Sequence, residues 1–302
     1  MMPKSDKSLL DGDSEERAFE AILAYVHRER RLDCSQYKDS FLRRRLAVRL
    51  RACEVYTCGE YLEVLRSSPS EINAFLTTIT INLSYFFRDG AAFGALHNAV
   101  LAVLIARRSQ TRRLRLTVWS AGCAGGEEPY SVAMILADLL GPALPSWDVK
   151  IHATDLDEAA LMHARRGVYK AFSFSPSGGQ ADFVERYFTQ IGDNYAVLPM
   201  IRQMVTFQQH DLAKPPPLPS YDLILCRNVL IYFTRQHQKR IIQHLLDHLE
   251  PGGCLMLGMA EMLPLAFSSQ LKAVDGRLRI YRKSESASRR VGESASLLRS
   301  EK

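Results

Sequence analysis

A regular alternation of short apolar runs with amphipathic stretches fills this chain after residue 113, and no other feature constrains its fold as much. Runs of strand length alternate with stretches in which apolar residues recur at helical spacing. Such alternation is typical of an α/β protein with a parallel, doubly wound sheet. The predicted strands are Leu114–Ser120, Val149–Thr154, Met204–Gln208, Leu223–Cys226, Leu255–Gly258 and Leu278–Lys283, and the predicted helices are Glu128–Leu140, Asp157–Arg166 and Thr234–Leu249.

The first third of the chain shows helical spacing that no strand pattern interrupts. We predict a small all-helical domain at residues 15–90, in which Ser68 caps a helix that has Pro69 in its first turn. A linker helix and a basic connector follow at 91–113, and the α/β domain occupies 114–283. The sequence therefore predicts two domains of unequal size.

Three further segments stand apart from these domains. A long excursion at 169–203, between the second and third predicted strands, predicts a small subdomain. Residues 1–14 and 284–302 are polar and contain few large apolar residues, so we expect both tails to be disordered. No apolar run reaches the roughly 20 residues that span a bilayer, and the N-terminal residues have no secretory apolar segment. We therefore expect a cytoplasmic protein.

Cysteine and histidine spacing gives no sign of a metal site. The six cysteines are scattered without a CxxC pair, which argues against a zinc ribbon and against a disulfide framework. His244 and His248 lie four residues apart on one predicted helix, but no third ligand accompanies them. We expect reduced thiols and no bound metal.

The net charge of +6 is concentrated near the N-terminus, because residues 28–51 hold nine Lys or Arg against three Asp or Glu. A solvated charged face is the simplest interpretation, and docking of an acidic partner helix is the alternative. Nucleic acid is disfavoured because aromatic side chains do not interleave with the basic ones. The candidate docking residues lie on one predicted helix whose leucines face inward: Arg43, Arg44, Arg45, Arg49 and Arg51.

The stretch SAGCAGGEEPYSVAM, at 120–134, follows the first predicted strand and opens its helix. In a doubly wound sheet, ligands bind beyond the carboxyl ends of the strands, where the first turn is usually rich in glycine. The spacing here is not GxGxxG, and Glu127 and Glu128 would repel a pyrophosphate by about 4 kcal/mol at close range. A ligand with a positive group at that end fits better. The alternative is that both glutamates only complement the helix dipole.

The second predicted strand ends in Asp155, a position from which a carboxylate accepts hydrogen bonds from both hydroxyls of an adenosine ribose. A terminal Asp can also cap the next helix, but Asp157 is the better candidate for that cap. Glycines, an acidic first turn and an acidic end of the second strand together indicate an adenosine compound with a positive amino-acid tail. S-adenosylmethionine is that compound.

Four blocks of this sequence resemble the chemotaxis receptor glutamate methyltransferases (CheR). They are NLSYFFRD at 82–89, WSAGCAGGEEPYSVAM at 119–134, ATDLDEAAL at 153–161 and CRNVLIYF at 226–233. The resemblance spans most of residues 15–283. It implies a helical N-terminal domain, a Rossmann-like class I S-adenosylmethionine-dependent methyltransferase domain, and an inserted β-subdomain at about 186–203.

The resemblance also implies which residues hold the cofactor. Ser84 stands where threonine is usual in the family and Asp211 where asparagine is common, while GMAEML at 258–263 departs from the GHSEN type of ending. That last departure leaves the loop without an implied role. Together with Gly122 of the glycine-rich turn, the implied contacts are Asn82, Ser84, Arg88, Glu128, Asp155, Asp211, Leu212, Arg227 and Asn228.

By the same resemblance, the methyl acceptor is a glutamate carboxylate on a receptor helix, and S-adenosylhomocysteine is the second product. Because that carboxylate is ionised at neutral pH and a sulfonium activates the methyl group, no general base is required. Catalysis then consists of in-line alignment and exclusion of water. We predict that Arg88 aligns a carboxylate through two hydrogen bonds and that Tyr232 orients the reacting centre with its hydroxyl.

The implied partners are cytoplasmic helices of membrane-bound, methyl-accepting chemotaxis receptors, reached without membrane insertion. The stretch 186–207 is short for gripping a receptor-tail peptide, so we expect action that is independent of such a tail, by a monomer. Two alternatives remain. One is a methyltransferase of the same fold that acts on a small molecule or RNA, and the other is a non-catalytic, cofactor-binding scaffold of a sensory cluster.

Overall fold

The computed structural model describes residues 6–174 and 181–285, and it divides into two compact units. The helical unit consists of the chain up to Ile81 together with the short segment Tyr232–His237. The sheet unit consists of 82–231 and the chain from Gln238 onward. The helical unit therefore includes six residues from far along the sequence.

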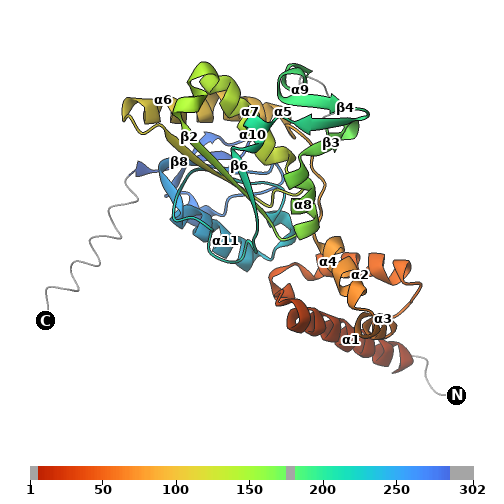
Figure 1. The fold of residues 1–302 in the computed structure, drawn as a ribbon. Coiled ribbons are helices and arrows are strands. Elements are labelled where there is room, and N and C mark those ends of the chain that lie inside the picture. The colour runs from red at the N-terminus through yellow and green to blue at the C-terminus, as the bar shows by residue number, and fades with distance from the viewer. Residues whose placement is uncertain (1–5, 175–180, 286–302) are drawn as a thin grey trace, which may run out of the picture. The chain divides into compact units, whose positions relative to one another are not determined.

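Four helices build the helical unit: α1 Asp6–Arg30, α2 Asp39–Ala52, α3 Cys58–Ser67 and α4 Pro69–Ile79 (Figure 1). Their apolar stripes meet in a core whose most buried members include Phe19, Tyr61 and Phe75. Thr57 starts α3 with a capping box, in which its hydroxyl accepts from the Glu60 amide while the Glu60 carboxylate accepts from the Thr57 amide.

Two expectations for this unit differ from the structure. Ser68 occupies the N-cap position of α4 and Pro69 its first turn, as predicted, but the Ser68 side chain makes no capping hydrogen bond. Its hydroxyl instead lies 3.0 Å from that of Ser70. The structure also begins α1 at Asp6, within the segment 1–14 that was expected to be a disordered tail. Residues 1–5 and 286–302 lie outside the described residues.

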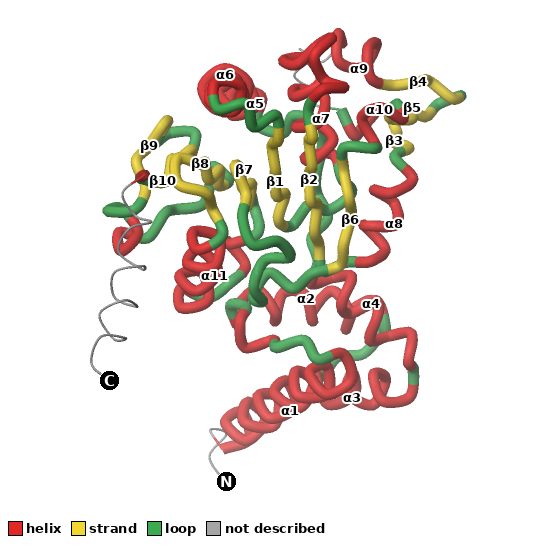
Figure 2. The backbone as a smooth tube through the Cα atoms, turned by 60° about the vertical axis from the view of Figure 1, so that its left-hand side comes forward, coloured by secondary structure: helices red, strands yellow, loops and turns green. Residues whose placement is uncertain are grey.

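The sheet unit is organised around seven strands in the order β6-β2-β1-β7-β8-β10-β9 (Figure 2). The first five pair in parallel, and β10 pairs antiparallel with both β8 and β9. This arrangement confirms the predicted α/β fold with a mostly parallel sheet. The strands are β1 Arg115–Ala121, β2 Asp148–Asp155, β6 Val205–Gln209, β7 Tyr221–Cys226, β8 Leu249–Leu257, β9 Leu271–Asp275 and β10 Ile280–Lys283.

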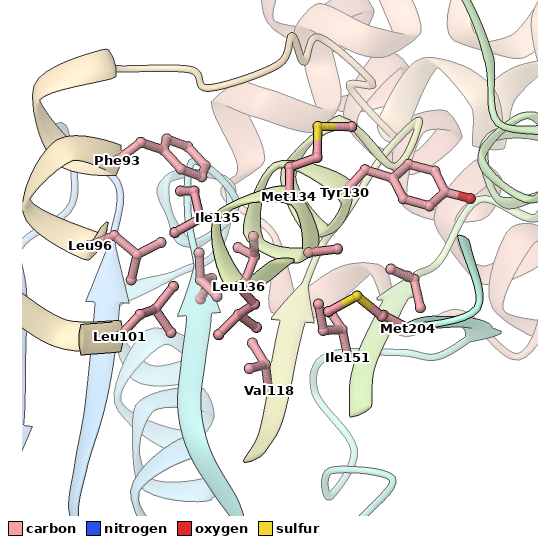
Figure 3. Packing of buried hydrophobic residues seen from close by; sticks show 14 of the residues in the cluster. Phe93, Leu96, Leu101, Val118, Tyr130, Met134, Ile135, Leu136, Ile151 and Met204 are labelled. Carbon is pink, nitrogen blue, oxygen red and sulfur yellow. The ribbon is translucent and has the colours of Figure 1, made fainter. Parts of the chain in front are cut away.

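Helices cover both faces of this sheet. The run formed by α5 Gly90–Ala95, a π-helical turn and α6 Ala102–Gln110 lies on one face together with α7 Glu127–Leu140, and α11 Arg235–Asp247 lies on the other face (Figures 1 and 2). Helix α8 Glu158–Arg166 follows β2 in the chain. Figure 3 shows Leu136 of α7 above Val118 of β1, in the main apolar core of the unit.

The stretch Gly90–Gln110 is long and apolar enough, by length and composition alone, to cross a membrane, with a mean hydropathy of 1.4. The length of uninterrupted apolar runs did not predict such a stretch, because polar residues interrupt it at intervals. Phe93, Leu96 and Leu101 on this helix are buried and point toward α7 and the sheet (Figure 3). Packing in the core therefore accounts for part of its apolar composition, since 33% of the apolar window is buried.

A second, three-stranded antiparallel sheet is inserted between α8 and β6, in the order β3-β5-β4. Its strands are β3 Val168–Lys170, β4 Phe188–Ile191 and β5 Asn194–Val197, flanked by the short helices α9 Ala181–Tyr187 and α10 Pro199–Arg202. This sheet extends further toward the N-terminus than the expected 186–203. The difference arises because β3 is three residues long and carries no recognisable alternation.

Candidate functional site

The glycine-rich turn after β1 has a backbone that only glycine adopts readily at two positions. Gly122 has φ +78° and Gly126 has φ +92°, both in the left-handed region. A Cβ on Gly126 would lie 2.8 Å from the Ala164 Cβ and 2.9 Å from the Tyr169 hydroxyl. The amide of Gly122 donates to the Thr154 carbonyl at 2.8 Å, which ties the turn to the end of β2. This confirms that a constrained glycine turn opens α7.

Glu128 lies in the first turn of α7 and is held on both carboxylate oxygens. The Ser120 hydroxyl donates to Oε1 at 2.7 Å, and the Arg227 guanidinium donates to Oε2 at 3.2 Å. Arg227 follows β7, which is paired with β1, so Glu128 links the ends of two neighbouring strands. A carboxylate fixed in this way keeps lone pairs available for a further, cationic donor.

Glu127, beside it, has a different environment, which the sequence did not reveal. Its side chain is buried, its Oε2 atom has no hydrogen-bond partner, and the carboxylate lies against Gly125, where a Cβ would be 2.9 Å from Oε2. Burial raises the pKa of Glu127 to about 7, against smaller opposing effects of its own amide and of the Ser84 hydroxyl. The two glutamates are therefore not equivalent.

Asp155, the last residue of β2, is fixed by two backbone amides. Ala124 donates to Oδ2 at 2.9 Å and Asp157 donates to Oδ1 at 3.0 Å. Burial raises the pKa of Asp155, and these hydrogen bonds oppose the rise. The prediction that Asp157 caps α8 is confirmed, because its carboxylate accepts hydrogen bonds from the Ala159 and Ala160 amides. Asp155 is left with its remaining lone pairs for a ligand.

The segment 82–89 lies against this edge of the sheet unit. Asn82 donates from Nδ2 to the Asp157 carboxylate at 2.7 Å, and the Phe87 amide donates to the Ser131 hydroxyl at 3.0 Å. Arg88 donates to the Leu83 carbonyl at 2.7 Å, within the same segment. The segment is therefore anchored at both ends.

The two phenylalanines of this segment are packed in apolar surroundings. Phe86 is fully buried and stacks on Phe174 at 5.2 Å, with Phe188 of the small sheet edge-on to it. Phe87 is also buried, in the main core cluster. Both belong to the apolar framework that supports the neighbouring polar residues.

Arg227 connects this segment to the sheet. Its side chain is 2% exposed and donates to Asp89 at 2.7 Å, to Glu128 at 3.2 Å and to the Arg88 carbonyl at 2.9 Å. A buried cation of this kind is stable only with such partners. Arg227, Glu128 and the end of segment 82–89 thus form one network, which the sequence motifs suggested only as separate blocks.

Glu261, in the loop after β8, was missed because its loop departs from the family pattern. It is 3% exposed, and its Oε1 accepts from the Val229 and Leu230 amides while Oε2 accepts from the Gly258 and Asn228 amides, at 2.6–3.0 Å. Burial raises the pKa of Glu261, and the four hydrogen bonds oppose this rise. Asn228 has φ +60°, so Glu261 stabilises an unusual backbone beside Arg227.

The remaining predicted residues lie in two places. Asp211 and Leu212 follow β6; the Asp211 carboxylate accepts from the Ala213 amide at 3.0 Å, and Leu212 is buried. Tyr232 belongs to the helical unit, where its ring packs on Phe41 at 4.7 Å. Arg88 and Tyr232, the two predicted catalytic residues, therefore belong to different units.

The five arginines of the expected docking face on α2 differ in exposure and in partners. Arg49 is only 19% exposed and makes two hydrogen bonds of 2.8 Å with Glu71 of α4, so it stabilises the helical unit. Arg43 is paired with Glu16 and Asp39. Arg45 is half-buried, with its guanidinium over the Phe41 ring. Of the five arginines, Arg44 and Arg51 are exposed.

Comparison with known families agrees with this arrangement. Residues 82–280 match the family model described as "CheR methyltransferase, SAM binding domain", and residues 17–80 match "CheR methyltransferase, all-alpha domain". The chain belongs to the CheR methyltransferase family. The resemblance noted in the sequence is confirmed, and its cofactor is S-adenosylmethionine.

Curated relatives of this CheR chain carry the name "Chemotaxis protein methyltransferase". The protein from Listeria monocytogenes is 35% identical over 240 residues, which are 79% of this chain and 87% of the relative. The protein from Escherichia coli K12 is 35% identical over 251 residues, covering 80% and 83%. A "Chemotaxis protein methyltransferase 2" from Pseudomonas aeruginosa is 32% identical over 270 residues, covering 86% and 93%.

The residues at the edge of the sheet suit this cofactor. Three partly or fully buried carboxylates, those of Glu127, Glu128 and Asp155, surround the turn after β1, and Glu127 has an oxygen without a partner. Such a site favours the positive ammonium and sulfonium groups of S-adenosylmethionine over a pyrophosphate. Gly122 has φ +78°, and a Cβ there would lie 3.3 Å from the Val229 Cβ, so glycine suits this position of the turn.

Proposed function

We propose that this CheR methyltransferase transfers methyl groups to glutamate side chains of methyl-accepting chemotaxis receptors, as a protein-glutamate O-methyltransferase of sensory adaptation. The observation that carries the proposal is the 35% identity, over most of both chains, to a relative named for methyl transfer in chemotaxis. The acidic site around the glycine turn supports it, because a sulfonium donor is needed for transfer to a carboxylate.

The chemistry requires little from the protein beyond positioning. The bound cofactor supplies an activated methyl group on a positively charged sulfur. The acceptor carboxylate forms a bond to the methyl carbon, and the carbon–sulfur bond breaks with its electron pair remaining on sulfur. Two opposite charges disappear in this step, and the products are a neutral ester and a neutral thioether. A site of low water content therefore favours the transition state.

We assign the cofactor contacts as follows. Glu128 accepts hydrogen bonds from the ammonium group of the cofactor, and Asp155 accepts them from the ribose hydroxyls. Asp211 and Leu212 are assigned to the adenine. Asn82, Ser84, Arg88, Arg227 and Asn228 complete the site. Arg227 has a positioning role in this scheme, because it holds Glu128 and Asp89 together. Arg88 and Tyr232 align the acceptor carboxylate.

Arg88→Ala tests both the reaction and the role of Arg88. The wild-type protein, incubated with tritiated S-adenosylmethionine and receptor-containing membranes, should label the receptor with methyl groups that base hydrolysis releases. The variant should lose at least about 100-fold of this rate, since aligning groups contribute on this scale. Circular dichroism should report the same fold in both proteins, since Arg88 is itself an assigned cofactor contact. Base-stable label, or label in RNA, would contradict the proposal.

A further inference from the structure

The loop between β8 and β9 places exposed apolar side chains beside the candidate site. Met262 is 74% exposed and Leu265 is 89% exposed, while Met259 is 42% exposed. Single exposed apolar residues are ordinary on protein surfaces. Three of them within seven residues, in a loop at the functional edge of the sheet, form an apolar surface that we call the 259–265 surface.

Close backbone contact places this surface next to the site. Gly258 ends the strand side of the loop, and a Cβ there would lie 2.7 Å from the Asn228 amide nitrogen and 3.0 Å from the Asn228 Nδ2. Met259 is the next residue in the chain, so the loop begins beside Asn228. Because β7 and β8 are parallel neighbours, their following loops emerge at the same edge of the sheet.

Glu261 makes the loop a fixed part of the sheet unit. Its carboxylate accepts hydrogen bonds from four backbone amides, three of which belong to Asn228–Leu230 in the turn after β7. Phe267, at the far end of the loop, is buried. The side chains on either side of Glu261 therefore point away from a braced backbone and are not part of a freely moving segment.

We infer that the 259–265 surface contacts the apolar flank of the segment that carries the acceptor glutamate. This inference rests on the proposed function. A partner that places its carboxylate at the cofactor must approach the carboxyl edge of the sheet, where the loop lies. An amphipathic helix carries apolar residues three or four positions from its polar ones, so it offers both the acceptor and an apolar neighbour to this edge. Methionine side chains adapt to the shape of an apolar partner, so Met259 and Met262 suit contact with such a helix.

The test is steady-state methyl transfer into a purified receptor cytoplasmic fragment, with a Met262→Ser/Leu265→Ser double variant. We expect KM for the fragment to rise about tenfold, because two exposed side chains lose an apolar contact. The values of kcat at saturating fragment and of Kd for S-adenosylhomocysteine should stay unchanged, since neither residue supports the cofactor site.

Met200→Ser is the matched control. Met200 is 47% exposed and lies on α10, just before β6. It therefore lies toward the amino ends of the parallel strands, whereas the 259–265 surface follows their carboxyl ends. The control should leave KM unchanged. A double variant with wild-type KM would overturn the inference while the proposed function stands. A rise in the Kd for S-adenosylhomocysteine that accounts for the whole loss would also overturn it, because the surface would then serve the cofactor site. Absence of methyl transfer by the wild-type protein would remove both proposals.

Discussion

At the scale of single residues, the Glu261 carboxylate ties the loop after β8 to the turn after β7. One carboxylate accepts from four amides, two on each oxygen. A glutamine there offers one acceptor oxygen and one NH2 group, and the NH2 group would face two amide donors. Hydrogen bonds to charged groups contribute about 1.5–3 kcal/mol each.

We therefore expect Glu261→Gln to lower the free energy of unfolding by about 2 kcal/mol and to weaken binding of S-adenosylhomocysteine about tenfold. Urea denaturation and calorimetry measure the two quantities. Glu158→Gln is a suitable control, because Glu158 is 45% exposed and forms a surface ion pair with Arg165. Equal behaviour of the two variants would show that the four hydrogen bonds contribute little.

Glu127 gives a prediction of pH dependence. Burial raises its pKa from 4.5 to about 7 in the folded protein. Between these values the folded chain binds more protons than the unfolded chain, so the free energy of unfolding falls as pH rises from 4.5 to 7. The total loss is about 3 kcal/mol in the absence of ligand, at about 1.4 kcal/mol for each pKa unit.

Glu127→Gln removes the titrating group and should flatten this part of the pH profile. The variant should therefore melt at a higher temperature than the wild type at pH 8, and the two should converge near pH 4.5. Thermal unfolding followed by circular dichroism over pH 4.5–8 measures the effect. Parallel profiles for the two proteins would show that Glu127 is not the group responsible.

At the scale of elements, helix α2 has two distinct faces. Arg49 is committed to Glu71, whose carboxylate also accepts from the Tyr61 hydroxyl at 2.7 Å. That internal network joins three helices, and a charge reversal at Arg49 would damage the fold. Arg44 and Arg51 are exposed, so they test the docking hypothesis without this complication.

Arg44→Glu/Arg51→Glu should raise KM for receptor and leave kcat nearly unchanged, because acidic receptor helices would be repelled before they reach the site. The effect should diminish at high salt as the Debye length shortens from about 10 Å toward 3 Å. Methyl-transfer kinetics at low and high salt measure it. Arg66→Glu on α3, whose arginine is 52% exposed, is the control. Equal KM in the double variant and the control would leave α2 as an ordinary solvated helix.

Local patterns were sufficient to predict the elements that carry their own signal. The parallel strands, the glycine turn before α7 and the Asp157 cap all follow from spacing within a few residues. Strand β9, Leu271–Asp275, was missed because its apolar positions are few and it lies at an edge of the sheet. The roles of Arg49 and Glu261 depend on partners 22 and about 32 residues away, which spacing alone does not reveal.

At the scale of the whole molecule, the helical unit holds residues Tyr232–His237. Phe233 stacks on Tyr37 at 4.9 Å, and the Thr234 amide donates to the Gln36 carbonyl at 2.9 Å. A fragment that begins at Asn82 lacks these partners. We expect it to bind S-adenosylhomocysteine but to lose methyl transfer, because Tyr232 is no longer positioned.

Hydrogen exchange measures whether the segment that holds Tyr232 is ordered. The Thr234 amide should be protected in the full chain and exchange freely in the fragment. Tyr37→Leu in the full chain removes one stacking partner and should give an intermediate result. Methyl transfer by the fragment at the rate of the full chain would show that the helical unit is dispensable for alignment.

The chain passes between the two units three times, after Ile81, after Ile231 and after His237. A linker cut at one place would thus not separate them, and a transplanted N-terminal domain would have to recognise a foreign hexapeptide. Arg227 belongs to the sheet unit, and Tyr232, five residues later in the chain, belongs to the helical unit. Removal of the helical unit therefore takes away the packing partners of Tyr232 without removing Tyr232 itself from the chain.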